Sequence, residues 1–423
     1  MKGVQITLRQ AFIQGCKNCR WFAGFFIFLQ VMKRLFFLLP FFLPQLLAGQ
    51  WQLSPQAEIR IITGGPYQGE LYSAFGHSAV RVYDPVAGLD LLYNYGVFDF
   101  EQPNFYLNFA RGRLNYQLAT GSYRGFIAAY RAEGRYVKEQ ILNLNPGQKQ
   151  AYFNFLQVNA LPENRTYAYD YFYDNCATRV WEGLKAALGP SLRLNSQYVA
   201  TGPSIRDLCD DYLRLQPWGD VGIDLCLGLP MDKKASAYEH MFLPDYLHLA
   251  MSRAEVRDST GWRPLVRQEV QTLAAQAQAV QGTAFRPWMA ATLLLILGVG
   301  LSLWGGSRGG FNLWFDGLFF SLLGILGWLL LGLWLLTDHR AAAQNFNLLW
   351  ALPLWFPALY LLLKNRKYHR LWLFAGIWYL LVLLSWLLWP QDLHLAFLPL
   401  AGLAAYRSFY RYRMPQYQHH AQT

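Results

Sequence analysis

One cysteine, Cys176, stands where helix geometry can activate a thiol. It lies in the stretch YDYFYDNCATRVWEGL, directly after Asp174 and Asn175 and directly before a helix predicted over residues 177–188. The thiolate is the nucleophilic form of cysteine, and the unpaired N–H groups and dipole at a helix N-terminus lower a cysteine pKa. If Asp174 or Asn175 caps the helix, the Cys176 N–H can also bind an oxyanion during acyl transfer. We therefore predict a nucleophilic cysteine, with a small buried core residue as the alternative.

An activated cysteine needs a base, and the sequence offers one histidine for that role. His77 is the only histidine that precedes Cys176. It begins the segment HSAVRVYD, whose alternation predicts a strand over residues 77–84. We predict that His77 is the general base. The alternative is a structural histidine hydrogen-bonded at the end of a loop.

A third group usually orients the histidine of such a pair. Asn94 is the candidate, because it lies in the next predicted strand, residues 89–100, on the same face as Gly96. The missing side chain of Gly96 leaves room for a ring. Asp99 and Asp174 are the other candidates for this role, and a polar residue that closes a sheet edge is the alternative interpretation of Asn94.

The elements that must position these residues form an α+β domain. Alternation predicts an antiparallel sheet, and Asn145 followed by a proline predicts the start of a helix. A polar helix over residues 264–281 is expected to join this domain to the rest of the chain. The expected strands cover residues 57–63, 77–84 and 89–100, and the expected helices cover residues 103–110, 122–134, 146–161 and 177–188.

The remaining cysteines predict a disulfide and no metal site. In an oxidising compartment Cys209 and Cys226, which are close in sequence, are expected to pair, which leaves Cys176 as a free thiol. The C-x-x-C pair of Cys16 and Cys19 lies in an N-terminal extension, and the chain has no H-E-x-x-H motif. We expect neither a metal nor another cofactor.

The second part of the chain has the composition of a membrane domain. Its apolar runs approach or exceed the roughly 18 to 20 residues that span a bilayer. The net charge of +11 concentrates in short basic segments beside these runs, which indicates the positive-inside bias rather than nucleic-acid binding. Five spans then leave the N-terminal domain outside the cytoplasm. The apolar runs are Trp288–Trp304, Phe311–Leu336, Leu348–Leu363, Leu371–Trp389 and, more weakly, Leu393–Tyr406.

The N-terminus predicts export. Residues 32–50 have a basic start, an apolar stretch and a small-residue end, as in a secretory signal peptide, and residues 1–31 form an upstream extension. An uncleaved anchor over residues 21–47 is the alternative. The expected organisation is an extension and signal over residues 1–49, a periplasmic domain over 50–263, a linker helix over 264–287, a membrane domain of about five helices over 288–407 and a basic or polar cytoplasmic tail over 408–423.

Four separated motifs resemble the Lnb family of Gram-negative lipoprotein N-acyltransferases. They are FGHSAVRVYD, LYNYGVFDF, YDYFYDNCATR and TDHRAAAQNFNLLWALPL. The resemblance implies a bacterial inner-membrane protein with a periplasmic domain similar to permuted papain-like (NlpC-like) proteins, followed by an all-α transmembrane domain. It also implies that Cys176 accepts a fatty acyl group from a phospholipid, with His77 as base, and passes it to the α-amino group of a diacylglyceryl-cysteine lipoprotein.

The loop after the second apolar run lies on the same side of the membrane as the cysteine. Its residues His339 and Asn345 are candidates for binding a phospholipid headgroup, although polarity in a solvent-facing loop is an equal alternative. Two further functions remain open at this point. A Cys-His amidase or peptidase acting on the cell wall uses the same pair but does not need five spans, and a non-catalytic membrane assembly module needs neither residue for chemistry.

Overall fold

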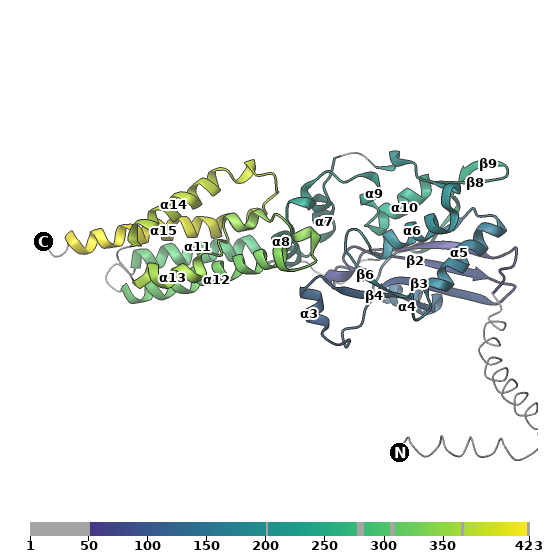
Figure 1. The fold of residues 1–423 in the computed structure, drawn as a ribbon, viewed down its shortest axis with the longest axis horizontal. Coiled ribbons are helices and arrows are strands. Elements are labelled where there is room, and N and C mark those ends of the chain that lie inside the picture. The colour runs from purple at the N-terminus through teal and green to yellow at the C-terminus, as the bar shows by residue number, and fades with distance from the viewer. Residues whose placement is uncertain (1–50, 200–201, 277–282, 305–308, 365–367, 421–423) are drawn as a thin grey trace, which may run out of the picture. The chain divides into compact units, whose positions relative to one another are not determined.

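The computed structural model describes residues 51–199, 202–276, 283–304, 309–364 and 368–420 (Figure 1). The expected extension and signal segment, residues 1–49, lie outside these ranges, as do Cys16 and Cys19. The chain divides after Gln52 into two compact units. Everything below concerns the second unit, Leu53–Thr423.

A seven-stranded antiparallel sheet forms the centre of the N-terminal domain, in the order β10-β5-β1-β2-β3-β4-β6. The three strands expected from alternation are confirmed as β1, β2 and β3. In the pairing of β2 with β3, Ala79 lies opposite Asn94, so the two expected site strands are neighbours. The strands are β1 (Glu58–Gly64), β2 (His77–Asp84), β3 (Leu89–Val97), β4 (Leu114–Ser122), β5 (Val137–Leu142), β6 (Thr166–Tyr169) and β10 (Val266–Leu273).

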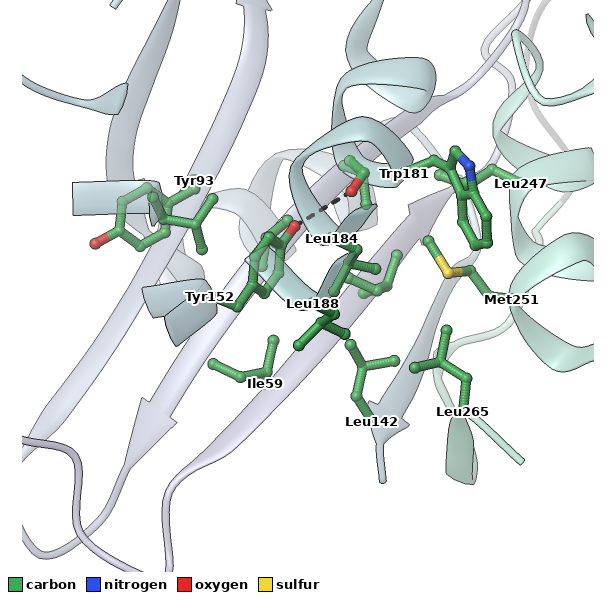
Figure 2. Packing of buried hydrophobic residues seen from close by; sticks show 14 of the residues in the cluster. Ile59, Tyr93, Leu142, Tyr152, Trp181, Leu184, Leu188, Leu247, Met251 and Leu265 are labelled. Carbon is green, nitrogen blue, oxygen red and sulfur yellow. Dashed lines mark hydrogen bonds between the residues drawn. The ribbon is translucent and has the colours of Figure 1, made fainter. Parts of the chain in front are cut away.

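Helices pack on both faces of this sheet over apolar clusters. On one face Val180 and Leu184 of α6 and Met251 of α10 pack against strand residues such as Ile59 (Figure 2). On the other face Ile127 of α4 joins a smaller cluster. The helices are α3 (Phe105–Ala110), α4 (Tyr123–Ala132), α5 (Pro146–Asn159), α6 (Cys176–Leu188), α7 (Ile205–Leu213), α8 (Pro217–Cys226), α9 (Ala237–His240) and α10 (Pro244–Arg253).

The start of α5 confirms the capping prediction. The Asn145 side chain accepts a hydrogen bond from the Gln148 N–H at 2.8 Å, and the Gln148 side chain accepts one from the Asn145 N–H at 3.1 Å. Two of the unpaired N–H donors at this helix end are therefore satisfied. Short 3-10 helices connect other elements: η1 (Leu71–Ser73), η2 (Gly189–Ser191), η3 (Ser196–Tyr198), η4 (Leu229–Asp232), η5 (Arg340–Ala342), η6 (Phe346–Leu349), η8 (Trp386–Leu388) and η9 (Leu395–Phe397).

The expected polar helix over residues 264–281 is wrong for the part that the structure describes. β10 runs through Leu273 and pairs with β5 at the sheet edge, so the domain extends past the expected boundary at residue 263. Val266, Val270 and Thr272 are β-branched and favour a strand, and the free edge of β5 supplies hydrogen-bond partners that composition does not reveal. A three-stranded sheet precedes β10, with the strands β7 (Leu192–Arg193), β8 (Glu255–Asp258) and β9 (Gly261–Pro264).

Apolar helices make up the second half of the unit. Among the described residues, two segments are long and apolar enough to cross a bilayer, Pro287–Trp304 and Asn312–Leu336. The fifth helix continues through His420, so the segment expected as a separate tail from residue 408 belongs to that helix as far as the structure describes it. The helices are α11 (Pro287–Trp304), α12 (Gly309–Leu336), α13 (Trp355–Lys364), α14 (His369–Leu384) and α15 (Leu398–His420).

A buried ion pair joins three of these helices. Arg407 of α15 and Asp316 of α12 are both fully buried. Arg407 Nε donates to Asp316 Oδ1 at 2.6 Å, and Arg407 Nη1 donates to the Gly298 carbonyl oxygen of α11 at 3.2 Å. Because a buried charge without a partner is costly, this pairing favours one arrangement of α11, α12 and α15.

Candidate active site

The α6 helix begins at Cys176 because Asn175 caps it. Asn175 Oδ1 accepts hydrogen bonds from the N–H groups of Ala177 and Thr178 at 2.9 and 3.0 Å. The Asn175 N–H donates to Thr178 Oγ1 at 2.8 Å, and Asn175 Nδ2 donates to the Phe242 carbonyl oxygen at 2.7 Å. Hydrogen bonds therefore hold both the backbone and the side chain of Asn175. Cys176 occupies the first helical position, as the sequence predicts.

Asp174, the other possible cap, is an ion-pair partner instead. Arg179 Nη2 donates to Asp174 Oδ2 at 2.6 Å, and Arg179 Nε contacts the second carboxylate oxygen. The Arg179 guanidinium also lies over the Tyr167 ring, 3.9 Å from its centroid. This ion pair links the residue before the cap to the first turns of α6, and the neutral Asn175 is the cap.

The Cys176 sulfur is buried against backbone N–H groups. The N–H groups of Ser78, Ala177 and Cys176 itself act to lower the thiol pKa, but burial, the largest effect, raises the pKa of Cys176 above its ordinary value. The residue is only 8% exposed. The N–H groups at the helix N-terminus therefore lower the pKa of Cys176 as expected, but burial outweighs them, because desolvation destabilises the thiolate more than these dipoles stabilise it. A buried protonated thiol needs a base to react.

His77 and Asn94 are in contact, as the sequence predicts. His77 Nε2 lies 3.3 Å from Asn94 Oδ1. Because an amide oxygen only accepts, this hydrogen bond requires a proton on Nε2 and leaves Nδ1 with the lone pair of a base. Burial, the largest effect, lowers the pKa of His77 to about 4; the Asn94 hydrogen bond opposes this shift and the nearby Arg135 adds to it. The imidazole is therefore neutral at pH 7.

The Cys176 sulfur lies beside the beginning of β2, the strand that starts with His77. The sulfur faces the N–H of Ser78, the residue that follows His77. Although both residues are described in full, the hydrogen bonds formed in the described part of the chain do not include one between the sulfur and the imidazole. Such contacts are often long before substrate binds and shorten in the reacting complex.

Gly96 provides the space expected beside Asn94, but a tyrosine ring fills it. Gly96 has a φ of 84°, in the left-handed region that favours glycine. A Cβ added there lies 3.1 Å from Tyr169 Cε2 and 3.7 Å from the Cys176 Cβ. The Tyr169 ring packs on Tyr116 with a centroid separation of 4.5 Å. Tyr169 and Cys176 are therefore neighbours across the position that a side chain at residue 96 would occupy.

A cavity of about 1260 Å³ borders this tyrosine. Its walls come from the segment after α3, from β6 and the following loop, from α6, and from the end of α12 with the loop that follows. Tyr169, Asp174 and Arg179 line it, whereas Cys176 does not. Tyr169 therefore borders the cavity and also lies beside Cys176.

The two residues expected to bind a headgroup, His339 and Asn345, lie in different surroundings. His339 lines the cavity, and its Nε2 donates to the Phe109 carbonyl oxygen at 3.0 Å. Asn345 is 3% exposed; its Nδ2 donates to the Leu225 carbonyl oxygen at 2.8 Å, and its Oδ1 accepts from the Asn347 N–H at 2.9 Å. These bonds to backbone occupy the buried amide of Asn345 and hold it away from the cavity wall, so of the two residues only His339 borders the cavity; substrate binding by either residue stays a prediction.

The expected disulfide is absent from the structure. Cys209 and Cys226 are both free thiols. Cys209 is 1% exposed and packs in a cluster with Ile205 and Leu208, whereas Cys226 ends α8. Closeness in sequence therefore does not bring the two sulfurs together, because α7 turns Cys209 into an apolar core. Within the described residues, no group of three or more His, Cys, Asp or Glu side chains is placed to hold a metal ion.

Two contributors to the site are not predicted by the sequence. The Ser78 N–H is a backbone group, and side-chain patterns carry no information about it. Tyr169 belongs to the alternating aromatic run RTYAYDYFY, which predicts an extended segment before the cysteine but not the ring that would cover it. The aromatic density of that run was the available signal.

The fold and site define a membrane protein in which an α+β domain with a capped cysteine helix precedes a set of apolar helices. Residues 57–211 match the family model of the Lnb N-terminal periplasmic domain, and residues 278–419 match that of the Lnb transmembrane domain. The chain belongs to the Lnb family, which confirms the resemblance and indicates an acyltransferase in the inner membrane with a periplasmic N-terminal domain. No curated protein and no solved structure matches the chain.

Proposed function

We propose that this protein is a lipoprotein N-acyltransferase in which Cys176 carries the acyl group as a thioester. One observation carries the proposal: the Cys176 sulfur lies at the N-terminus of α6, faces three backbone N–H groups, and approaches the strand that begins with His77. The contact of His77 with Asn94 supplies the orienting group that a thiol-imidazole pair requires. The permuted papain-like fold is part of this proposal.

The first half-reaction forms the thioester. His77 Nδ1 takes the thiol proton while Cys176 Sγ attacks the ester carbonyl carbon of a phospholipid. The N–H groups of Ser78 and Cys176 stabilise the negative charge that develops on the carbonyl oxygen. When the carbon–oxygen bond breaks, His77 returns the proton to the leaving oxygen. The products are a lysophospholipid and S-acyl Cys176.

The second half-reaction forms an amide. The neutral α-amino nitrogen of a diacylglyceryl-cysteine lipoprotein attacks the thioester carbonyl carbon. His77 accepts a proton from this nitrogen, the carbon–sulfur bond breaks, and the proton passes to the Cys176 sulfur. The free thiol returns and the lipoprotein gains an N-acyl chain. No cofactor enters either step.

The membrane half supports lipid substrates over soluble ones. Donor and acceptor both reside in the bilayer, so a domain tethered to it meets them at high local concentration. Two apolar segments of α11 and α12 are long enough to cross the membrane, and we propose that α13 to α15 complete a domain of five spans. The cavity beside Tyr169 lies next to the residues that follow α12, on the side that faces the periplasmic domain.

Mass spectrometry of lipoprotein N-termini tests the proposal in cells. The comparison is between the parent protein, a deletion, Cys176→Ala, His77→Ala and the matched control Cys226→Ala, in a host with no other N-acyltransferase. We expect N-acyl chains with the parent and Cys226→Ala, none with the deletion or Cys176→Ala, and a loss of at least about 100-fold with His77→Ala, which removes the general base.

Unchanged N-acylation in the Cys176→Ala strain contradicts the proposal. If N-acylation never depends on this protein and the parent instead releases cell-wall fragments in a Cys176-dependent manner, the same pair serves a thiol amidase. If Cys176→Ala retains every measurable function of the parent, the domain acts without catalysis.

A further inference from the structure

The cavity beside Tyr169 reaches the point where α12 ends. α12 ends at Leu336, whose side chain is 83% exposed, and Asp338 follows two residues later. The Asp338 N–H donates to the Arg111 carbonyl oxygen at 2.9 Å, and His339 binds the backbone of α3. These bonds hold the segment after α3 against the end of an apolar helix, so the cavity lies at the level where a bilayer meets water.

The helix beside the cavity has the composition of a membrane interface. α3 contributes Asn108 to the cavity wall, and the same helix exposes Tyr106 at 75%, Leu107 at 48% and Phe109 at 42%. Aromatic side chains favour the headgroup level of a bilayer. A lipid in the outer leaflet therefore meets aromatic groups at the rim and polar groups inside.

Most charges in the cavity wall already have partners. Arg113 Nε donates to Asp338 Oδ2 at 3.0 Å, and Arg179 pairs with Asp174. Arg340 lines the cavity as well, yet among the described residues it forms no hydrogen bond and no ion pair through its guanidinium. Its charge acts on the Tyr173 phenol, which belongs to another wall of the same cavity.

The neighbouring histidine already uses one ring nitrogen within the protein. His339 Nε2 donates to the Phe109 carbonyl oxygen, so at most one ring nitrogen is left for a ligand. A guanidinium offers five N–H donors in a geometry that matches phosphate oxygens.

We propose that Arg340 binds the phosphate group of the acyl donor in this cavity and thereby selects a phospholipid over a phosphate-free lipid. The inference rests on the proposed function, in which the donor carries a phosphodiester and the acceptor lipoprotein does not. Arg340 then holds the donor headgroup while its ester passes Tyr169 to reach the sulfur. Arg340 is a binding residue and takes no part in the bond changes at Cys176.

Equilibrium binding to the delipidated full-length protein in detergent tests the proposal apart from catalysis. The background is Cys176→Ala, so no turnover occurs, and the probes are radiolabelled phosphatidylglycerol and diacylglycerol with the same chains. Arg340→Gln should weaken phosphatidylglycerol binding about tenfold or more, the scale of a lost charge-assisted hydrogen bond, with little change for diacylglycerol. The phosphatidylglycerol affinity of Arg340→Lys should lie between that of the background and that of Arg340→Gln. The matched control is Arg124→Gln on α4, another exposed arginine without an ion pair in the described part of the chain.

The outcomes separate this proposal from the proposed function. Equal phosphatidylglycerol binding by Arg340→Gln and its background overturns phosphate binding by Arg340. An equal loss of affinity for both lipids overturns it as well, because the substitution then removes no contact specific to phosphate. Competition with inorganic phosphate distinguishes the sources: if phosphate alone binds and the lipid does not, a lipid headgroup site is overturned. If Arg340 governs phospholipid binding but the parent forms no thioester on Cys176, the proposed function fails and the binding site stands.

Discussion

Tyr169 and Cys176 both lie within 4 Å of the position that a Cβ on Gly96 would take, and this crowding makes a quantitative prediction for Gly96→Ala. Two costs add. The φ of 84° places a new Cβ in the left-handed region, which costs roughly 1–2 kcal/mol. The same Cβ lies 3.1 Å from Tyr169 Cε2, so the ring must move against Tyr116, and overpacking of this kind costs about 1 kcal/mol or more. We expect a total loss of about 2–3 kcal/mol.

Gly88→Ala separates the two costs. Gly88 has a φ of 65°, and an added Cβ there meets no atom within 4 Å. It therefore carries the backbone cost alone, about 1–2 kcal/mol. The double variant Gly96→Ala with Tyr169→Leu removes the ring edge, and the excess of Gly96→Ala over Gly88→Ala should then shrink. The measured coupling between residues 96 and 169 reports the contact itself.

Thermal unfolding of the detergent-solubilised protein, followed by tryptophan fluorescence, measures these differences. A loss of 1 kcal/mol lowers the Tm of a domain of this size by about 2–4 °C. Gly96→Ala should therefore unfold several degrees below Gly88→Ala, and its N-acylation should fall because the new methyl group displaces Tyr169 beside Cys176. If Gly96→Ala and Gly88→Ala match in both Tm and activity, or if the double-variant cycle shows no coupling, the described crowding of Tyr169 against Gly96 is refuted.

Further predictions concern ionisation and packing. Since burial raises the pKa of Cys176, its alkylation by iodoacetamide should be slow at pH 7 and still rising at pH 9; a plateau near neutrality contradicts a buried thiol. Burial lowers the pKa of His77 from 6.5 to about 4, so the unfolded chain binds the proton first. The free energy of unfolding should therefore fall as pH drops from 6.5 to 4, by about 2 kcal/mol after allowance for partial exposure. His77→Gln should remove that part of the acid sensitivity, and equal pH profiles for the parent and His77→Gln would count against a buried neutral imidazole. Asn94→Ala removes the acceptor of the imidazole and should slow thioester formation at least about tenfold while leaving phospholipid binding unchanged; a matching loss of binding would show a different role. Asn345→Ala removes one hydrogen bond to the Leu225 carbonyl oxygen and should lower the free energy of unfolding by about 1–2 kcal/mol. A change in lipid affinity without a change in Tm would instead favour substrate binding by Asn345.

Local signals in the sequence were sufficient where short-range physics decides the outcome. The cap at Asn175 and the start of α6 at Cys176 follow from residues within one turn of the helix. The neighbouring strands that carry His77 and Asn94 follow from alternation across a hairpin, which sets their register within a few residues. The two halves of the chain follow from apolar run length alone.

Tertiary effects decided the rest. The direction of the Cys176 pKa depends on how deeply the sulfur is buried, which no local pattern reports. β10 became a strand because the edge of β5 was available, and this partner lies more than a hundred residues earlier in the chain. Cys209 lies in an apolar cluster, and the disulfide that residue type and spacing suggested does not form. The amide of Asn345 binds buried backbone, a contact that residue type does not reveal.

The acylation state of Cys176 is the direct test of whether this sulfur carries the acyl group. The parent protein, Cys226→Ala and Cys176→Ala are incubated with phosphatidylethanolamine without acceptor, digested under mildly acidic conditions and analysed by mass spectrometry. We expect one acyl group on Cys176 in the first two proteins, sensitive to hydroxylamine and lost on addition of a diacylglyceryl-cysteine peptide as the amide product accumulates. Amide formation at the parent rate by Cys176→Ala, or an acyl group that never leaves Cys176 when acceptor is added, would contradict a thioester intermediate.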